Sequence, residues 1–242
     1  TLLQLSPEHE ACVVEMGMRG LGQIEELALI AEPTIGIITN VGTSHIELLG
    51  SQEAIAEAKS ELIRCLGPDS VAILNEDDQA MSSIAEGKTV TYGIHSNATV
   101  IGSHLRYKKD GIKFTCKCYD EVFDVFLPMI GEHNVYDALA AIAAGRVLGV
   151  KSSKIKKGLS DFTGTPMRQE IVAFEDIVIL NDAYNANPSS MSESIKALGQ
   201  LEGKRKIAML GDMLELGDFT EEGHRQVGRL LAEEGYSVVF TF

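Results

Sequence analysis

Apolar and polar positions in the first part of the chain follow two periods in turn. Apolar runs of strand length occur at 11–16, 34–39 and 70–74, and helical spacing occurs at 24–31 and from about Ser51 to Leu66. Strands that alternate with helices predict βαβ units and a parallel sheet. We therefore expect an α/β fold with a mostly parallel central sheet.

The pattern changes over residues 89–128. Segments there are short, alternate in polarity and are broken by turn sequences such as KKDG at 108–111. Alternation between tight turns is typical of hairpins. We expect an antiparallel hairpin subregion made of TVTYG, ATVIGSHLRY, IKFTCKCY and VFDVFLP.

A turn-rich segment at 161–169, DFTGTPMRQ, is interpreted as a linker. We expect one domain at 1–165 and a partial, Rossmann-like α/β domain at 166–242. The remaining expected elements are helices at 133–149, 152–160, after Pro188 and at 220–234, a strand pair within 170–182, and strands at 206–210 and at the chain end.

Composition excludes several classes of protein. The chain has 242 residues, 45% of them apolar, which is typical of a globular protein. Its net charge of −14 makes it a poor candidate for a general nucleic-acid or anionic-membrane surface. No apolar run approaches the roughly 18 residues of a transmembrane helix. We expect a monomer without nucleic-acid or membrane partners.

The four cysteines, at 12, 65, 116 and 118, are expected to be reduced thiols of a cytoplasmic protein. Cys12 falls in the apolar run at 11–16, which predicts a buried strand, and Cys116 and Cys118 share one strand face. No signal peptide is recognisable. Because the chain begins without methionine and ends inside the apolar run SVVFTF, we expect a piece of a longer protein.

Polar residues gather just past the predicted strands. In parallel α/β sheets, ligands bind beyond the carboxyl ends of the strands. The pattern therefore predicts a binding site at this edge of the sheet. The residues concerned are Glu15, Asn40, Thr43, Ser44, His45, Glu47, Asn181, Asp182, Tyr184, Asn185, Asn187, Asp212 and Glu215.

Lys59 occupies an apolar slot of the helix predicted at 51–66, beside Ile55 and Leu62. Burying an unpaired ammonium costs several kcal/mol. Its head group reaches water, or forms a salt bridge in a site, or reacts with CO₂ to give a metal-binding carbamate. Spacing alone favours the first alternative.

Two further residues each have a structural and a metal-binding interpretation. Glu15 is either a solvated turn carboxylate or a ligand for a hard cation such as Mg²⁺. His45 either makes a local hydrogen bond or binds metal. The loop at 17–22 reads GMRGLG, which is not G-x-G-x-x-G and more often indicates a plain turn than a phosphate site.

The stretch NDAYNANPSSM contains a strong helix start, because Asn187 is a good N-cap and Pro188 suits the first helical position. Free N–H groups at such a start attract anions, although capping alone also explains the pair. Asp182, Tyr184 and Asn185 crowd the same turn. Residues 218–221, DFTE, predict a capping box.

Six stretches in this order resemble the Mur ligases, and the resemblance covers essentially the whole chain. They are EMGMRGLGQIEEL, NVGTSHIELLGSQEAIAEAKSEL, GEHNVYDALAA, GTPMRQEI, NDAYNANPSSM and GDMLELG. The family has three domains, and this chain resembles the central ATPase domain from its middle onward and the first half of the C-terminal domain.

The resemblance implies an ATP-dependent, amide-forming ligase with Mg²⁺, acting in peptidoglycan precursor synthesis and hence in bacterial cell wall biogenesis, cell shape and cell division. YNANPSSM and GDMLELG resemble the branch that joins D-alanyl-D-alanine to UDP-N-acetylmuramoyl-tripeptide through an acyl phosphate. The alternatives are another amino-acid-adding Mur ligase, a folylpolyglutamate-synthase-like enzyme, or a non-catalytic piece. No G-x-x-G-K-[ST] phosphate loop occurs, so we expect the chain alone not to hydrolyse ATP.

The resemblance also implies residue roles. Glu15, His45 and Lys59 match residues of two magnesium sites and so carry catalysis, with Lys59 as the carbamylated ligand. The residues implied for nucleotide binding are Asn134, Asp137, Arg168, Asp182, Tyr184, Asn185 and Asn187. Asp137 stands where the family has asparagine; it cannot donate amide hydrogen bonds but can accept one from an adenine amino group.

Overall fold

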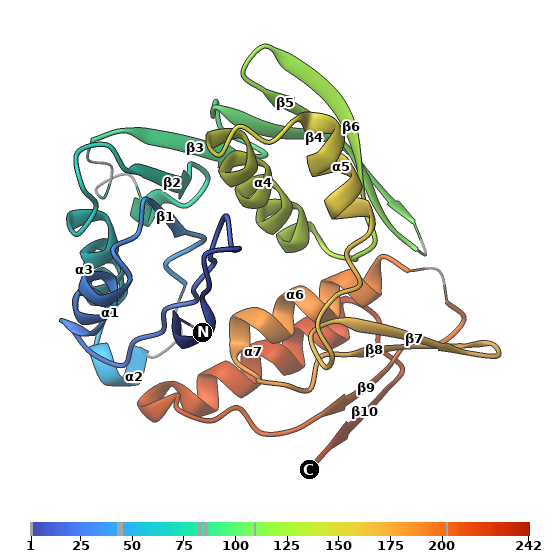
Figure 1. The fold of residues 1–242 in the computed structure, drawn as a ribbon. Helices are drawn as coiled ribbons and strands as arrows, with labels where there is room; N and C mark the ends of the chain where they lie inside the picture. The colour runs from blue at the N-terminus through green and yellow to red at the C-terminus, as the bar shows by residue number, and fades with distance from the viewer. Residues whose placement is uncertain (1, 43–45, 82–83, 85–86, 109, 202) are drawn as a thin grey trace.

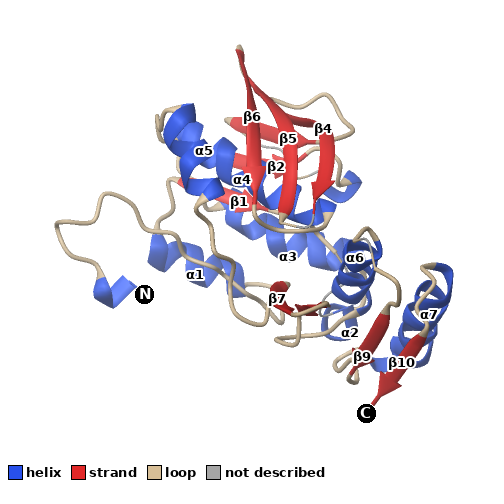
Figure 2. Cartoon of the chain, turned by 90° about the vertical axis from the view of Figure 1, so that its right-hand side faces the viewer, coloured by secondary structure: helices blue, strands red, loops and turns tan. Residues whose placement is uncertain are grey.

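The computed structural model describes residues 2–42, 46–81, 84, 87–108, 110–201 and 203–242. It divides into a large unit, residues 2–160, and a small unit, residues 170–241, joined by the segment that follows helix α5 (Figure 1). Figure 2 shows the same two units from the side. None of the described helices is long and apolar enough to cross a bilayer.

A six-stranded sheet forms the centre of the large unit, in the order β1-β2-β3-β4-β5-β6. The first four strands pair in parallel and the last three in antiparallel fashion. The predicted fold class, a mostly parallel sheet with an antiparallel subregion, is therefore confirmed. The strands are β1 (Ile35–Ile38), β2 (Val71–Asn75), β3 (Thr89–Gly93), β4 (Val100–Lys108), β5 (Gly111–Cys118) and β6 (Glu121–Leu127).

Helices cover both faces of this sheet (Figure 1). Ile73 of β2 packs in the core beneath α4, whereas its neighbours Ala72 and Leu74 pack in the core beneath α3. Successive side chains of a strand point to opposite faces, which explains this alternation. The helices of this unit are α1 (Gln23–Ala31), α2 (Ile46–Leu49), α3 (Gln52–Arg64), α4 (Glu132–Val147) and α5 (Ser152–Ser160), with short 3-10 turns at Leu2–Gln4 and Gln79–Met81.

The small unit is also α/β. An antiparallel hairpin and a parallel strand pair lie beside two helices that share one apolar core. The hairpin confirms the strand pair expected within 170–182. The elements are β7 (Glu170–Phe174), β8 (Ile177–Asn181), α6 (Pro188–Gly199), β9 (Ile207–Leu210), a 3-10 turn at Gly217–Phe219, α7 (Thr220–Glu233) and β10 (Val238–Thr241).

The strand predicted at 11–16 is absent. Those residues form no strand, and Cys12, expected to be buried there, is exposed. An apolar run becomes a strand only where a neighbouring strand supplies hydrogen bonds, and β1 forms the edge of the described sheet on this side. Cys116 and Cys118 are both buried on one face of β5, and all four thiols are free.

Two further expectations are corrected. TVTYG is strand β3, which pairs in parallel with β2 and β4 rather than antiparallel. Alternating polarity reports which face of a strand is buried and not the direction of its neighbour. The capping box expected at 218–221 is also absent: Phe219 is the N-cap of α7 without a side-chain hydrogen bond, and the Thr220 hydroxyl donates to the carbonyl of Gly217.

Candidate functional site

The ammonium of Lys59 lies where β1 ends. Ser51 caps the N-terminus of α3. Two turns further along, the half-buried Lys59 side chain donates from Nζ to the carbonyl oxygens of Asn40, at 2.6 Å, and Val41, at 3.1 Å. Backbone carbonyls therefore satisfy the charge that the sequence pattern placed in the apolar stripe beside Ile55.

Two opposing effects act on the charge of Lys59. Burial disfavours the ammonium and lowers the pKa of Lys59, and the nearby Asp78 carboxylate works against this shift. Asp78 also holds the loop that Lys59 contacts, because its Oδ2 accepts from the Val41 amide at 2.7 Å. The amine, and not the ammonium, is the nucleophilic form of lysine. A lowered pKa therefore favours reaction of Lys59 with an electrophile such as CO₂.

Side chains of the neighbouring strands also hydrogen-bond to the end of β1. The Asn75 side chain of β2 and the Tyr92 hydroxyl of β3 both donate to the carbonyl of Thr39, each at 3.2 Å. Burial raises the pKa of Tyr92, so its hydroxyl stays protonated and remains a donor. Three strands thus fix the backbone that Lys59 contacts.

Of the other two residues implied in metal binding, the structure describes only Glu15. Glu15 is exposed in the loop before α1, without a side-chain hydrogen bond or ion pair to any described residue. His45 lies outside the described residues. Within the described part of the chain, no group of three His, Cys, Asp or Glu side chains is arranged to hold a metal ion. The described donors alone do not form a magnesium site.

The glycine-rich loop at 17–22 leads into α1 as a plain turn. Glu61 of α3, only 5% exposed, accepts hydrogen bonds from the amides of Gly22, at 2.6 Å, and Glu25, at 3.1 Å. Free N–H groups at a helix start are what attract an anion. Because a protein carboxylate already occupies this position, the loop is not available to a phosphate.

Asn134 lies in the first turn of α4, against the linker. Its amide nitrogen donates to the carbonyl of Ile130 at 2.6 Å and to Oε1 of Gln169 at 2.7 Å. The neighbouring His133 contacts the same Gln169 oxygen through Nε2 at 2.8 Å. Asn134 is therefore fixed by contacts that come from outside its own helix.

Asp182 follows β8 and faces the linker from the small unit. Its Oδ1 accepts from the amide of Gln169 at 3.2 Å, and its Oδ2 accepts from the hydroxyl of Ser194 on α6. Ser194 in turn accepts from the Gln169 side chain at 3.0 Å. Gln169 thus links Asn134 and Asp182, two residues that lie 48 positions apart in the sequence.

Arg168 and Tyr184 form a second contact beside this one. The Arg168 guanidinium lies 4.2 Å from the centre of the Tyr184 ring, which is cation–π distance. Both side chains are exposed, as is Asn185. Asn187 is the predicted N-cap of α6: its Oδ1 accepts from the Ser190 amide at 2.9 Å. Capping thus occupies the Asn187 side chain and leaves Arg168, Tyr184 and Asn185 free toward solvent.

Asp137 lies one turn after Asn134 on α4. Its side chain reaches solvent, yet the surrounding protein partly desolvates the carboxyl and raises its pKa, while the neighbouring His133 acts in the opposite direction. Asp137 makes no side-chain hydrogen bond to the described residues. Its carboxyl remains free to accept one.

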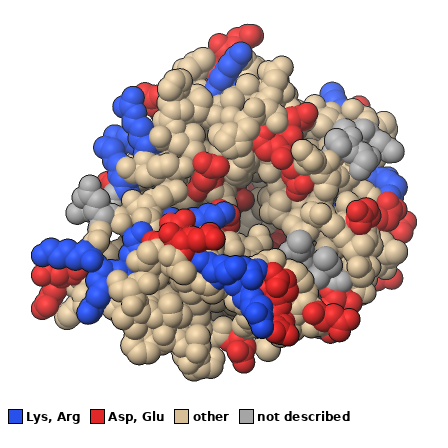
Figure 3. Space-filling view, turned by 180° about the vertical axis from the view of Figure 1, so that it is seen from behind, with Lys and Arg blue, Asp and Glu red and all other residues tan. Residues whose placement is uncertain are grey.

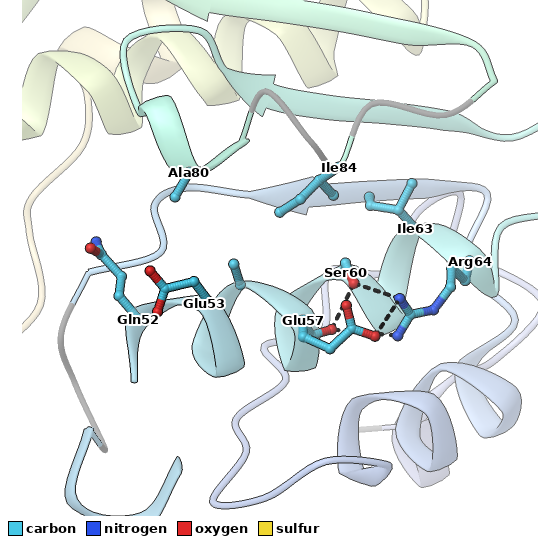
Figure 4. A pocket seen from close by; sticks show the side chains of 9 residues that line it. Gln52, Glu53, Glu57, Ser60, Ile63, Arg64, Ala80 and Ile84 are labelled. Atoms are coloured by element: carbon cyan, nitrogen blue, oxygen red, sulfur yellow. Dashed lines mark hydrogen bonds and ion pairs between the residues drawn. The ribbon is translucent and has the colours of Figure 1, made fainter. Parts of the chain in front are cut away.

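A cavity of about 780 Å³ opens in the small unit beside the Asp182 turn. It is lined by Asp182, Tyr184 and Asn185 together with apolar residues of β9 such as Met209. A smaller cavity, about 290 Å³, lies along α3 and does not include Lys59. In Figure 4, Glu57 and Ser60 bind Arg64 along that helix, opposite Ala80 and Ile84. Only the larger cavity touches residues expected to bind nucleotide.

The resemblance proposed Asn134, Asp182, Arg168 and Tyr184 for nucleotide binding, and the structure places Arg168 in the linker and the other three on either side of it. Sequence reasoning did not single out Gln169, Ser194, Asp78 or Glu61. Each is a polar residue in or beside a loop or helix whose partners lie far away in sequence.

Comparison with known protein families matches both units. Residues 1–145 match the Mur ligase middle domain, and residues 167–242 match the Mur ligase glutamate ligase domain. Curated relatives are named UDP-N-acetylmuramoyl-tripeptide–D-alanyl-D-alanine ligase. The Bacillus subtilis protein is 39% identical over 100% of this chain and 53% of its own length, and the Synechocystis protein 42% identical over 99% and 52%.

Solved structures of MurF are similar to this chain as well. MurF from Acinetobacter baumannii matches with a TM-score of 0.93 and 32% identity, over 99% of this chain and 53% of that one. MurF ligase from Thermotoga maritima, solved in complex with ADP, matches with a TM-score of 0.84 and 26% identity, over 92% of this chain and 51% of that one. The chain spans about half the length of the relatives that it matches.

Proposed function

The chain belongs to the Mur ligase family, and from this premise we propose that it is part of an ATP-dependent ligase that joins D-alanyl-D-alanine to UDP-N-acetylmuramoyl-tripeptide. One observation carries the proposal: relatives with that name match along essentially all of this chain, two of them at 39% and 42% identity. The stretches YNANPSSM and GDMLELG support the same branch.

The proposed reaction proceeds in two steps. The terminal carboxylate of the tripeptide attacks the γ-phosphorus of ATP, so that an acyl phosphate forms and ADP leaves. The amine of D-alanyl-D-alanine then attacks the acyl carbon, loses a proton and expels phosphate, which leaves the new amide. Positioning and charge neutralisation dominate catalysis of such phosphoryl transfers.

We assign residues 1–165 to the central ATPase domain and 166–242 to the first part of the ligase domain. ATP and Mg²⁺ are the proposed cofactors, and Mg²⁺ would neutralise the phosphate charges. Glu15, His45 and a carbamylated Lys59 are proposed as its ligands. The lowered pKa of Lys59 supports the carbamate.

Nucleotide binding is proposed at the linker. Asn134 and Asp137 would face the adenine, Asp182 the ribose and Arg168 the phosphates, with Tyr184, Asn185 and Asn187 in the adjoining turn. The support is geometric: Asn134 and Asp182 share Gln169 as a hydrogen-bonding partner, and Arg168 precedes it in sequence. The exposed guanidinium of Arg168 and the free carboxyl of Asp137 leave both able to contact a ligand.

The proposed protein is a monomer of the bacterial cytoplasm, without nucleic-acid or membrane partners. Figure 3 shows Lys and Arg interspersed with Asp and Glu on one face of a chain with net charge −14. Nucleic-acid surfaces instead carry a continuous basic patch.

Depletion of the protein in its host tests the proposal. A ligase of this kind uses UDP-N-acetylmuramoyl-tripeptide, so that compound should accumulate on depletion, as measured by mass spectrometry of cell extracts. Accumulation of a precursor with a shorter peptide, or of a folate lacking glutamates, would point to a different ligase.

A further inference from the structure

Gln169 is a buried amide in the segment between the two units. It is 7% exposed, whereas Arg168 and Glu170 on either side are exposed. A buried amide is costly unless its polar atoms are hydrogen-bonded. Its partners therefore indicate what holds it there.

The Gln169 side chain contacts both units. Its Oε1 accepts from Asn134 Nδ2 at 2.7 Å and lies 2.8 Å from Nε2 of His133, both on α4 of the large unit. Its Nε2 donates to the Ser194 hydroxyl on α6 of the small unit at 3.0 Å. Both acceptor positions of the amide oxygen are thus occupied from one unit, and the amide nitrogen is held by the other.

These contacts fix the orientation of the groups around Gln169. Asn134 Nδ2 has two hydrogens, which serve the carbonyl of Ile130 and Oε1 of Gln169. The remaining neighbour, Nε2 of His133, must then donate to Gln169 rather than accept from Asn134. Reversing the Gln169 amide would place two donors against Asn134 and His133, so only one orientation satisfies the cluster.

The backbone of Gln169 is constrained as well. Its N–H donates to Asp182 at 3.2 Å, and both Gln169, with φ of 49°, and Met167, with φ of 61°, adopt the left-handed region that side chains other than glycine rarely occupy. Arg168 lies between them. The backbone on both sides of Arg168 is therefore in an unusual conformation. Asp182 accepts from the Gln169 amide on one side, and on the other Met167 donates to Glu170 and accepts from the Tyr184 amide, each at 3.2 Å.

The two units also approach closely at this point. Gly131, just before α4, has φ of 90°, and a Cβ there would lie 3.1 Å from the Cβ of Ala197 on α6 and 2.4 Å from the ring of His133. Among the described residues, the units also meet at the exposed pair Arg19–Glu215, at 3.5 Å, and where Glu47 of α2 lies against the turn at Gly217. Exposed pairs contribute about 0–1 kcal/mol. The hydrogen bonds of Gln169 with His133, Asn134 and Ser194 are better shielded from solvent than this exposed pair.

We propose that Gln169 is a positioning residue: it sets the orientation of the small unit relative to the large one, and with it the mutual placement of Asn134, Asp182 and Arg168. The importance of this placement for ligand binding rests on the proposed nucleotide role of those three residues. The placement itself does not, because it follows from hydrogen bonds present in the free chain.

Residual dipolar couplings of the deuterated 242-residue chain test the proposal. Backbone amides of the two units should fit one common alignment tensor in the wild type. In Gln169→Leu, which has similar volume but no amide, each unit should require its own tensor. Gln226→Leu is the matched control, since Gln226 is exposed on α7 and makes no side-chain hydrogen bond to the described residues; it should keep the common tensor.

A residue that merely stabilised the fold would lower the melting temperature of Gln169→Leu and leave the common tensor intact, and that result would overturn the proposal. If Gln169→Leu does not fold, Ser194→Ala decides: separate tensors support the positioning role and a common tensor refutes it. Titration with Mg-ADP is scored separately. Absence of shifts at Asn134 and Asp182 in a chain that keeps one tensor would count against the nucleotide assignment alone.

Discussion

Nζ of Lys59 lies 2.6 Å from the carbonyl oxygen of Asn40, at the point where β1 ends. A second carbonyl, that of Val41, lies 3.1 Å away. An ammonium has three N–H groups and can serve both. On reaction with CO₂, the neutral nitrogen bonds to carbon, one C–O double bond becomes C–O⁻, and a proton leaves to solvent. The carbamate keeps one N–H, so it retains only one of these two contacts.

Carbamylation of Lys59 is directly measurable. The chain incubated with ¹³C-bicarbonate should show a carbamate carbon resonance, because burial lowers the pKa of Lys59 and favours the reactive amine. The resonance should disappear in Lys59→Arg and persist in Lys154→Ala, an exposed lysine on α5. A wild-type spectrum without the resonance, or one unchanged by Lys59→Arg, would contradict the assignment.

The His133–Glu193 contact predicts a pH dependence of stability. The two side chains approach to 3.5 Å across the units. Burial alone would lower the pKa of His133, but Glu193 and Gln169 raise it above its usual 6.5. The same contact lowers the pKa of Glu193 below its usual 4.5. The histidine contribution is complete below pH 6.5 and is lost above it. The glutamate contribution is complete above pH 4.5 and is lost below it.

The stabilisation from this pair should therefore be greatest between pH 4.5 and 6.5. In thermal melts, the difference in unfolding free energy between wild type and Glu193→Gln should peak in that window and decline on both sides. Its magnitude should be at most about 1 kcal/mol, because both groups are partly exposed. Lys196, three residues further along α6, also lies 3.5 Å from Glu193. Glu222→Gln, which breaks a surface pair with Arg229, should show no such peak. An equal peak in that variant would contradict the assignment of the pH dependence to the His133–Glu193 pair.

Glu61 should contribute to stability through the start of α1. Glu61→Ala leaves the partly buried amides of Gly22 and Glu25 without their acceptor, which costs at most about 1–3 kcal/mol. Denaturant unfolding measures the loss. Gln52→Ala, on an exposed position of the same helix, should change the unfolding free energy by less than about 0.5 kcal/mol. Equal losses in the two variants would show that Glu61 does not cap α1.

Sequence periodicity predicted the elements with strong local causes. The helix behind Ser51 and the one behind Asn187 and Pro188 carry their own caps, and both form where expected. The strand predicted at 11–16 does not form, because a strand needs a neighbouring strand and composition does not reveal one. The antiparallel pairing predicted for β3 was wrong for a related reason: alternating polarity describes a buried face and is the same for parallel and antiparallel partners.

The residues of the candidate site also differ in whether the sequence could indicate them. Asp182 was singled out because it follows a predicted strand, a position with a known relation to ligand binding. Asn134 was proposed only through the resemblance to the Mur ligases. Gln169 was not singled out, since a glutamine in a polar linker looks ordinary until its partners at 133, 134, 182 and 194 are known. Long-range hydrogen bonds of this kind leave no periodic pattern. His45 stays a prediction, because it lies outside the described residues.

The 242-residue chain alone should not hydrolyse ATP. Its sequence contains no G-x-x-G-K-[ST], the loop whose backbone amides and lysine hold the β- and γ-phosphates. Phosphate release from Mg-ATP should equal that of a Lys59→Ala preparation made in parallel. Metal-dependent release above this background would mean that another part of the chain holds the phosphates.

Ligation by a longer protein that carries this chain tests the central claim most directly. Purified enzyme is supplied with UDP-N-acetylmuramoyl-tripeptide and Mg-ATP, and either D-alanyl-D-alanine or single amino acids. The account predicts a pentapeptide product, with one ADP and one phosphate released per amide, only with the dipeptide. Turnover with a single amino acid and none with D-alanyl-D-alanine would contradict it.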